Sequence, residues 1–514
     1  MTTLTLPPTR PTESAARSKR TAAGIAIALL TLFALAGRLC YFAKPFDQDA
    51  RLFIYFGKLF CDGGWYGHDV MDNKFPTVGM MTSAWWRAIG LWWPGYVIAQ
   101  TVLIAGGAVL LGRMARRHFD SSAGLATTLF ALVFLNFSVI VFGGFQLEGF
   151  QVFFAILAAG AALESLRSSR GDVRDAFVVG LAAGCAMMFK PNGGAVLGAF
   201  AIASMIKLAR NPRALLKQGG ACAIGLAVPV AVTLVYLVRT DTLRDMPELY
   251  RQIARYAASR PLSFADWLKP IAILLLVAFP IFVRARVHRH ERIHPATGPD
   301  RAILLFVILW FAIELLGVLA HGHLTGNYFL VLFPPAALLY GMIPRQPRIT
   351  PIIAGLFPIV MLSTLGAIRV VREPGEFYSR QPASDYLIKH TQPGDAVWQD
   401  CMAQTLMETN LRPGSRVPLT YLFLNSDDAP QAYAAIMLND FSHRTPRYIL
   451  LPQDLDAYLG EKAKRIATEQ PALQHRFDRY CIAWRSIQTY VQSHYDPETS
   501  IAGETLYRRR DSGR

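Results

Sequence analysis

Charged residues are scarce in this sequence. They make up 17% of its 514 residues and hydrophobic residues make up 53%, whereas a typical soluble domain has about 25% charged residues. Apolar runs close to the length of a membrane span recur from Ala22 to Ile368, as in transmembrane helices. These features exclude an ordinary soluble enzyme. Beyond Val371 such runs are missing, and this tail is predicted to be a soluble domain.

Cysteine is also rare, with six residues, too few for a fold held together by disulfides. Cys185 and Cys222 lie in apolar runs and are expected to be packing residues. Cys401 and Cys481 lie in the tail, and they could form a disulfide if the tail faces an oxidising compartment. The spacing of the cysteines does not decide this, so the pairing stays open.

A cleavable signal peptide is not predicted, since the first apolar run is too long and lacks a cleavage site of small residues. The net charge of +16 raises the question of nucleic-acid binding. Most basic residues, however, lie in short loops between apolar runs, where they set the orientation of a membrane protein. The charge therefore indicates a membrane topology and argues against a nucleic-acid partner.

Eleven membrane spans are predicted, at 22–42, 95–111, 123–142, 150–163, 176–189, 194–208, 219–238, 267–283, 302–320, 328–342 and 352–368. The basic loops between them fall on the side of the N-terminus, which is then the cytoplasm. We therefore expect a cytoplasmic tail at 1–21, a membrane domain at 22–371 with its first outer loop at 43–94, and an outer soluble domain at 372–514.

The outer segment 239–266 is rich in arginine and is predicted to be an amphipathic helix on the membrane surface. In the tail, PASDYLIKHTQPGDAVWQD predicts a helix, a turn and a strand, and RTPRYILLP predicts another strand. The alternation in FDRYCIAWRS predicts a third strand. The tail is therefore expected to be a small α/β or α+β domain.

Residues with chemical potential gather on the outer side of the predicted topology. Ionisable groups at a membrane boundary are costly unless they are hydrated or paired, which makes them functional candidates. They are Asp47, Asp49, Asp69, Asp72, Asn73 and Lys74 in the first outer loop, Glu148 in the second, Lys190 in the third, and His321, His323, Asn327 and Tyr328 in the last.

Structural explanations stand beside the functional ones. Lys190 could extend its ammonium to lipid headgroups, and Glu148 could cap a helix N-terminus. His321 and His323 could be turn residues. Asp47 and Asp49 directly follow a membrane span and precede the apolar LFIYF, which favours the mouth of a cavity.

The order of these motifs resembles the C-type (GT-C) integral-membrane glycosyltransferases. It is similar to the bacterial branch of the protein O-mannosyltransferase superfamily, which includes aminoarabinose and galacturonosyl transferases that act on lipopolysaccharide. The resemblance covers most of the chain. It rests on DQDARLF, GGWYGHD, DNKFP, GGFQLEG, the helix ending in FKPNGG, GNYFLVLFPP and the tail phrase YLIKHTQPGDAVW. Two departures are Phe75, where the family has a proline, and Asn327, where a basic residue often precedes the tyrosine.

The resemblance implies a polytopic helical membrane protein of GT-C type in the bacterial inner membrane, with a periplasmic C-terminal α/β domain. It implies an inverting transfer of a sugar from a polyprenyl-phosphate donor to an envelope glycan, lipid or protein. An acceptor hydroxyl needs a carboxylate to take its proton, and the leaving phosphate needs positive charge. We expect Asp49, with Asp47 and Glu148, on the catalytic side. Lys74, Lys190, His323 and Tyr328 are expected at the phosphate, and Asp69, Asp72 and Asn73 in the substrate loop.

No cofactor is firmly predicted. Asp47 and Asp49 form an Asp-x-Asp pattern that could hold a divalent metal, but this short pattern is weak and metal-independent transfer is favoured. A transporter or lipid flippase is the alternative function. It would explain the many spans, but it explains poorly why the unusual residues share one face and why a soluble domain follows.

Overall fold

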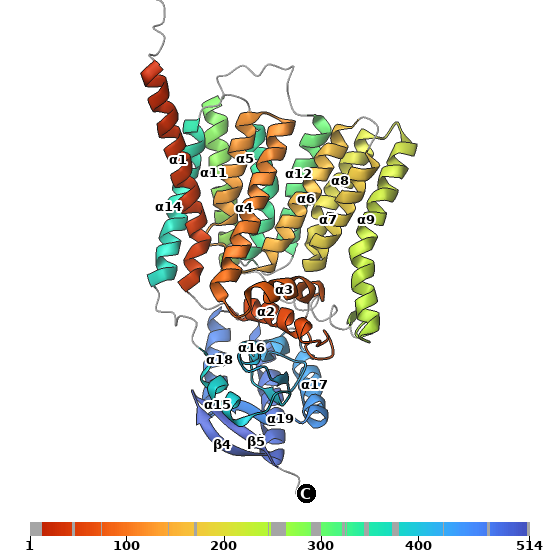
Figure 1. The fold of residues 1–514 in the computed structure, drawn as a ribbon, viewed down its shortest axis with the longest axis vertical. Helices are drawn as coiled ribbons and strands as arrows, with labels where there is room; N and C mark the ends of the chain where they lie inside the picture. Colours follow the sequence, from red (N-terminus) through yellow and green to blue (C-terminus); the bar gives the residue numbers. More distant parts are fainter. Residues whose placement is uncertain are drawn as a thin grey trace, which may run out of the picture.

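The computed structural model describes residues 13–43, 47–72, 74–141, 143–168, 172–244, 246–247, 264–288, 300–320, 324, 326–343, 349–372, 380–424, 426–469 and 473–510. A bundle of long helices forms one part of the molecule, and a mixed α/β domain at the C-terminal end forms the other (Figure 1). The predicted surface helix at 239–266 lies largely outside the described residues.

Each of the eleven predicted spans overlaps a helix, although α5 ends seven residues before the end of its predicted span and α13 covers only 333–342 of the span 328–342. The helices are α1 (Glu13–Leu39), α4 (Trp93–His118), α5 (Ser121–Leu135), α6 (Leu147–Arg167), α7 (Val173–Phe189), α8 (Ala195–Lys207), α9 (Pro212–Arg239), α11 (Phe264–His288), α12 (Arg301–Ala320), α13 (Phe333–Met342) and α14 (Ile349–Arg372). Seven helices of the described chain are long and apolar enough to cross a membrane by themselves. Predicted spans also fall on the shorter helices α5, α7, α8 and α13. A count of eleven crossings therefore stays a prediction.

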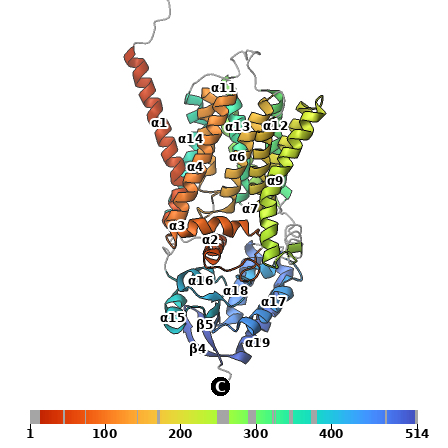
Figure 2. The same ribbon diagram turned by 45° about the vertical axis from the view of Figure 1, so that its right-hand side comes forward.

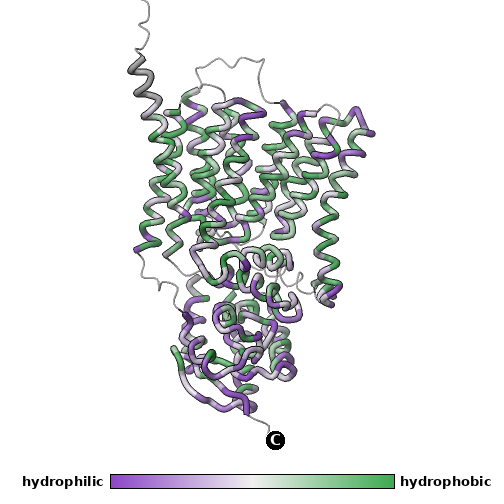
Figure 3. The backbone as a smooth tube through the Cα atoms, in the orientation of Figure 1, coloured by the Kyte–Doolittle hydropathy of each residue, from purple (hydrophilic) through white to green (hydrophobic). Residues whose placement is uncertain are grey.

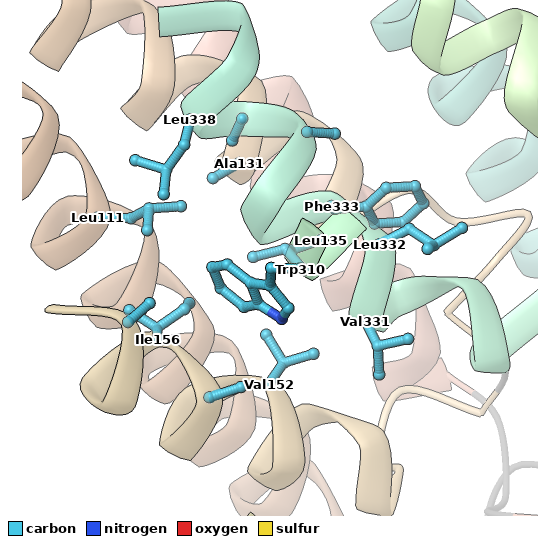
Figure 4. Packing of buried hydrophobic residues seen from close by; sticks show 14 of the residues in the cluster. Leu111, Ala131, Leu135, Val152, Ile156, Trp310, Val331, Leu332, Phe333 and Leu338 are labelled. Carbon is cyan, nitrogen blue, oxygen red and sulfur yellow. The ribbon is translucent and has the colours of Figure 1, made fainter. Parts of the chain in front are cut away.

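The bundle has an apolar outer surface as well as an apolar core. Hydrophobic residues cover most of its length, whereas hydrophilic residues concentrate in the C-terminal domain (Figure 3). In the core, Trp310 of α12 is fully buried and packs among Leu111, Val152 and Ile156 from neighbouring helices (Figure 4). A helix that is apolar all round is expected where lipid replaces water outside the protein.

Two short helices separate the bundle from the C-terminal domain (Figures 1 and 2). They are α2 (Gln48–Cys61) and α3 (Thr77–Ile89), and they form most of the segment predicted to be the first outer loop. Asp47 begins α2, because its side chain accepts a hydrogen bond from the backbone N–H of Ala50. Gly57 lets the two helices approach closely, since an added Cβ there would lie 2.5 Å from the Thr82 backbone.

The C-terminal domain contains a five-stranded mixed sheet with strand order β2-β1-β3-β5-β4. Its strands are β1 (Ala396–Trp398), β2 (Arg412–Pro413), β3 (Tyr448–Pro452), β4 (Tyr495–Ile501) and β5 (Glu504–Arg509). β1 pairs in parallel with β2 and β3, whereas β5 is antiparallel to β3 and β4. The helices of this domain are α15 (Pro382–His390), α16 (Ala403–Thr409), α17 (Ala429–Arg444), α18 (Leu455–Glu469) and α19 (Gln474–His494).

Two of the three tail predictions are confirmed, by α15 with β1 and by β3. The strand predicted for FDRYCIAWRS is wrong, because this stretch belongs to α19. Its buried residues Phe477, Tyr480, Trp484 and Ile487 follow each other at steps of three and four, which is the period of a helix. Cys401 and Cys481, which could have paired, are both free thiols.

The C-terminal domain packs directly on the loop that contains α2 and α3. Gln48 donates a hydrogen bond to the Cys401 sulfur at 2.9 Å, and Lys58 donates to the Asn410 side chain at 2.7 Å. The backbone N–H of Met71 reaches the Arg416 carbonyl at 2.6 Å. One hydrophobic cluster continues from α2 into the domain. The loop is therefore held between two folded parts.

Candidate active site

Glu148, which is buried, and Lys190, which is partly exposed, form an ion pair at the loop-facing end of the bundle. Glu148 lies in the first turn of α6, and Lys190 follows the last residue of α7. The Lys190 ammonium donates to one oxygen of Glu148, which also accepts from the Asn327 amide at 2.9 Å. The same ammonium lies 3.8 Å from the centre of the Tyr328 ring. Three distant segments thus meet at one carboxylate and one lysine.

Asp47 is held by two hydrogen bonds from different segments. One oxygen accepts from the Ala50 N–H at 2.8 Å, and the other accepts from the Gln146 side-chain amide at 2.8 Å. Burial, and then the nearby Asp49 carboxylate, raise the pKa of Asp47 to about 7, against the effect of these hydrogen bonds. Asp49 itself is exposed in the first turn of α2.

Lys74 pairs with the buried Asp72 at 3.2 Å and lies over the Phe53 ring. Burial acts to lower the pKa of Lys74, but the Asp72 and Asp49 carboxylates outweigh it and raise the pKa. The Tyr66 hydroxyl donates to the backbone carbonyls of Asp72 and Lys74. The loop thus presents a fixed, protonated lysine.

These groups are close enough to act on one another electrostatically. The Lys74 charge acts on Lys190, and Tyr328 acts on both lysines. Glu148 acts on Asp47, and Asp49 acts on Lys74. The structure therefore brings together eight of the twelve residues singled out in the sequence: Asp47, Asp49, Asp72, Lys74, Glu148, Lys190, Asn327 and Tyr328.

Asp69 lies apart from this cluster. Its carboxylate accepts from the Trp65 N–H at 2.8 Å and faces Arg444 of the C-terminal domain at 3.7 Å. It therefore joins the loop to that domain. Asn73, His321 and His323 lie outside the described residues.

Sequence reasoning missed the neutral side chains around the cluster. Gln146 contacts Asp47, and Gln151 donates at 3.0 Å to Asn192, which lies two residues after Lys190 in the turn Pro191–Gly194. An amide in an apolar sequence is a weaker signal than a charge. The one available hint was the position of Gln146 two residues before Glu148, in the glycine-flanked turn GGFQLEG.

Metal-ligating side chains are not clustered in the part of the chain that the structure describes. There, no three or more His, Cys, Asp or Glu residues are arranged to hold an ion. Both oxygens of Asp47 already accept hydrogen bonds from protein donors.

Residues 93–238 match the protein family described as dolichyl-phosphate-mannose-protein mannosyltransferase. Two solved structures of ArnT from Cupriavidus metallidurans share the fold, each over 95% of this chain and 98% of theirs. The apo structure has 14% sequence identity and a TM-score of 0.57, and the structure bound to undecaprenyl phosphate has 13% and 0.58. No curated protein sequence matches the chain. The family match and the shared fold confirm the resemblance drawn from the motifs.

Proposed function

We propose that this chain is a GT-C-type membrane glycosyltransferase that moves a sugar from a polyprenyl-phosphate donor to an envelope acceptor. The observation that carries the proposal is the meeting of Lys74 and Lys190 with Asp47, Asp49 and Glu148 at one end of an apolar bundle. A lipid-linked donor can reach such a site from the membrane. That the ArnT relative binds undecaprenyl phosphate supports this donor class.

The two lysines are proposed to bind the donor phosphate. Negative charge grows on this phosphate as the bond to the sugar breaks, and fixed positive charge nearby stabilises the transition state. Lys190 is 19% exposed and shares Glu148 with Asn327, so an incoming phosphate would compete with Glu148 for its ammonium. Tyr328 packs on the same ammonium and is proposed to fix its position.

The Asp47–Asp49 pair is proposed to supply the general base for the acceptor hydroxyl. Sequence reasoning chose Asp49, but the geometry favours Asp47. Asp47 is held by two donors from separate segments, and its pKa of about 7 suits a base that works near neutral pH. Asp49, which is exposed and interacts with Lys74, would then orient that lysine.

The step we propose is a single displacement. The acceptor oxygen attacks the anomeric carbon while the carbon–oxygen bond to the phosphate breaks. The acceptor proton passes to Asp47 and the electron pair leaves with the polyprenyl phosphate. This reaction inverts the anomeric centre. Because two lysines supply the positive charge, we propose transfer without a divalent metal.

The cell location is also a proposal. The basic loops lie at the end of the spans away from the first outer loop and the C-terminal domain, and the positive-inside rule assigns that end to the cytoplasm. The site and the C-terminal domain would then face the periplasm. The acceptor would be lipopolysaccharide or another envelope glycan, lipid or protein.

The test is sugar transfer by the purified full-length protein in detergent. Polyprenyl-phosphate sugars are offered as donors with extracted envelope fractions as acceptors, and labelled product is measured. Mass spectrometry of envelope glycans from cells with and without the protein then identifies the acceptor. If each donor is returned unchanged and the envelope glycans are the same in both cells, the glycosyltransferase assignment is wrong.

A further inference from the structure

Arg38 is a fully buried arginine near the end of α1. Its guanidinium donates to the Asn136 side chain at 3.2 Å and to the Gln100 side chain at 2.8 Å. It also donates to the Gly144 carbonyl at 3.0 Å and the Leu135 carbonyl at 2.8 Å. All four acceptors are neutral. A buried cation is costly, so its retention in the core calls for an explanation beyond packing.

Gln100 connects this arginine to the turn before α6. Its side-chain oxygen accepts from Arg38 and, at 2.9 Å, from the backbone N–H of Gln146. Its side-chain amide donates to the backbone carbonyl of Gln146 at 2.6 Å. Both backbone polar groups of Gln146 are therefore fixed by one buried side chain, and that side chain is fixed by Arg38.

Gln146 in turn reaches the carboxylate of Asp47, with its amide nitrogen 2.8 Å from the Oδ2 atom. The turn fits tightly around this contact. Gly143 and Gly144 have φ values of +69° and +76°, which favour glycine. A Cβ on Gly143 would lie 3.0 Å from the same oxygen of Asp47. The turn therefore places one amide donor against one carboxylate oxygen.

We propose that Arg38, Gln100 and Gln146 form a positioning relay that orients Asp47 and stabilises its ionised form. The inference rests on the proposed function for its catalytic meaning. Gln146 is the residue that contacts Asp47, and Arg38 and Gln100 act only through it. The network reaches Asp47 from the membrane side, opposite the contact that the Gln48 side chain makes with the C-terminal domain.

The relay favours the ionised form of Asp47, whereas the negative charges that face Asp47 favour its protonated form. These are Asp49 on α2 and Glu148 on α6, and both favour the protonated form of Asp47. A side-chain N–H that donates to a carboxylate favours the ionised form. Replacing Gln146 with leucine keeps the size of the side chain and removes this donor, so Asp47 should hold its proton to a higher pH.

The first test follows the protonation of Asp47 itself, by infrared difference spectra of the full-length protein in detergent across a pH titration. The carboxyl band of Asp47 is the one that Asp47→Asn removes. In Gln146→Leu, the pH at which this band is half lost should rise by about one unit, as expected when a hydrogen bond to a charged group is removed. This pH is the infrared midpoint. Gln146→Glu, which places a third carboxylate beside Asp47, should raise it further.

Gln218→Leu is the matched control. Gln218 is also buried and donates from its amide, to the Ser165 hydroxyl at 2.7 Å, but it lies at the opposite end of the bundle. This variant should leave the midpoint unchanged. Gln100→Leu should move it in the same direction as Gln146→Leu. A midpoint that stays at the wild-type value in both Gln146 variants overturns the relay.

The second test separates the relay from the proposed function. The acidic limb of the transfer rate against pH should move upward in Gln146→Leu together with the infrared midpoint, and kcat should fall more than donor KM changes. If the infrared midpoint moves while Asp47→Asn keeps full transfer, the relay stands and the role of Asp47 as base is wrong. If the midpoint does not move although Asp47→Asn abolishes transfer, the relay is wrong and the base assignment stands.

Discussion

Lys74 is fixed by Asp72 and by the Phe53 ring, so its charge is in place before the donor binds. A charge of this kind stabilises the leaving phosphate more as it becomes negative than in the ground state. Lys74→Ala should therefore lower turnover by more than it weakens donor binding. Lys74→Arg should recover only part of the wild-type turnover, because a planar guanidinium does not replace a compact ammonium. The measurement is a titration of donor and acceptor against each variant.

Lys389→Ala is the control for this prediction, since Lys389 is an exposed lysine on α15 in the C-terminal domain. It should transfer sugar at the wild-type rate. If Lys74→Ala changes only the apparent acceptor affinity, with turnover and donor affinity intact, Lys74 belongs to the acceptor side of the site.

Asp47 and Asp49 should respond differently to the same conservative change. Asp47→Asn keeps the shape and removes the base, which typically costs about 10²–10⁴-fold in rate. Asp49→Asn removes a charge that acts on Lys74, and a smaller loss is expected. Rates measured at saturating donor for the two variants compare them. If Asp47→Asn transfers sugar at a near-normal rate and Asp49→Asn does not, Asp49 is the general base, as the sequence predicts.

The pH dependence follows from the same carboxyl group. The base must be ionised to accept a proton, and the pKa of Asp47 is raised to about 7. The rate should therefore fall as the pH drops below about 7, where an ordinary aspartate would still be ionised. A profile of kcat/KM from pH 5 to 9 measures this fall of the rate on the acidic side. A rate that stays level down to pH 5 would contradict it.

At the residue scale, charge made the residues of the candidate site stand out in the sequence. Asp47, Glu148, Lys74 and Lys190 stand out because an apolar sequence holds few charged residues, and an ionisable group at a membrane boundary is costly. Gln100 and Gln146 are neutral and occur in runs that read as ordinary span ends. Their importance depends on contacts between segments far apart in the sequence, and one sequence alone does not reveal such contacts.

At the element scale, α7 and α9 approach through glycines. A Cβ on Gly180 would lie 1.9 Å from the Cys222 carbonyl oxygen, and a Cβ on Gly225 would lie 2.1 Å from the Phe177 carbonyl oxygen. Small residues of this kind let helices in membranes pack closely. Gly180→Val should force the two helices apart and destabilise the protein by about 1–3 kcal/mol or more.

Thermal unfolding in detergent measures this effect, and Gly220→Val provides the matched control. Gly220 lies in the same helix as Gly225, but an added Cβ there meets no atom within 4 Å. The control should keep the unfolding temperature of the wild type. Equal losses in the two variants would show that the cost comes from valine in a helix and not from the contact.

The helices of the bundle were predictable because apolar length is a strong signal, and each predicted span falls on a helix. The strand prediction for FDRYCIAWRS is wrong because a stretch of ten residues can fit both the two-residue period of a strand and the 3.6-residue period of a helix. The longer stretch Gln474–His494 buries Arg476, Tyr480, Ala483, Ile487 and Val491 along one face of a helix. The helices α2 and α3 were not predicted. They are short and amphipathic, and the polar turn between them made the whole segment look like a loop.

At the scale of the whole molecule, orientation is the property to test. A chain with a cytoplasmic N-terminus and an odd number of spans places its C-terminal domain outside the cytoplasm. A C-terminal fusion to a reporter that is active only in the cytoplasm should therefore stay silent. The same reporter fused in the basic segment 209–218, which covers the link from α8 to α9 and the start of α9, should give signal. A bright C-terminal fusion would reverse the orientation and move the site to the other face.

The site draws on segments made at very different times during synthesis. Asp47 and Lys74 leave the ribosome early, Glu148 and Lys190 follow, and Tyr328 comes only after most of the bundle has been made. The α2 helix also packs on a domain that is made last. A nascent chain therefore carries Lys74 and Lys190 long before it can hold them in place. The candidate site is therefore complete only at the end of the protein's own biosynthesis.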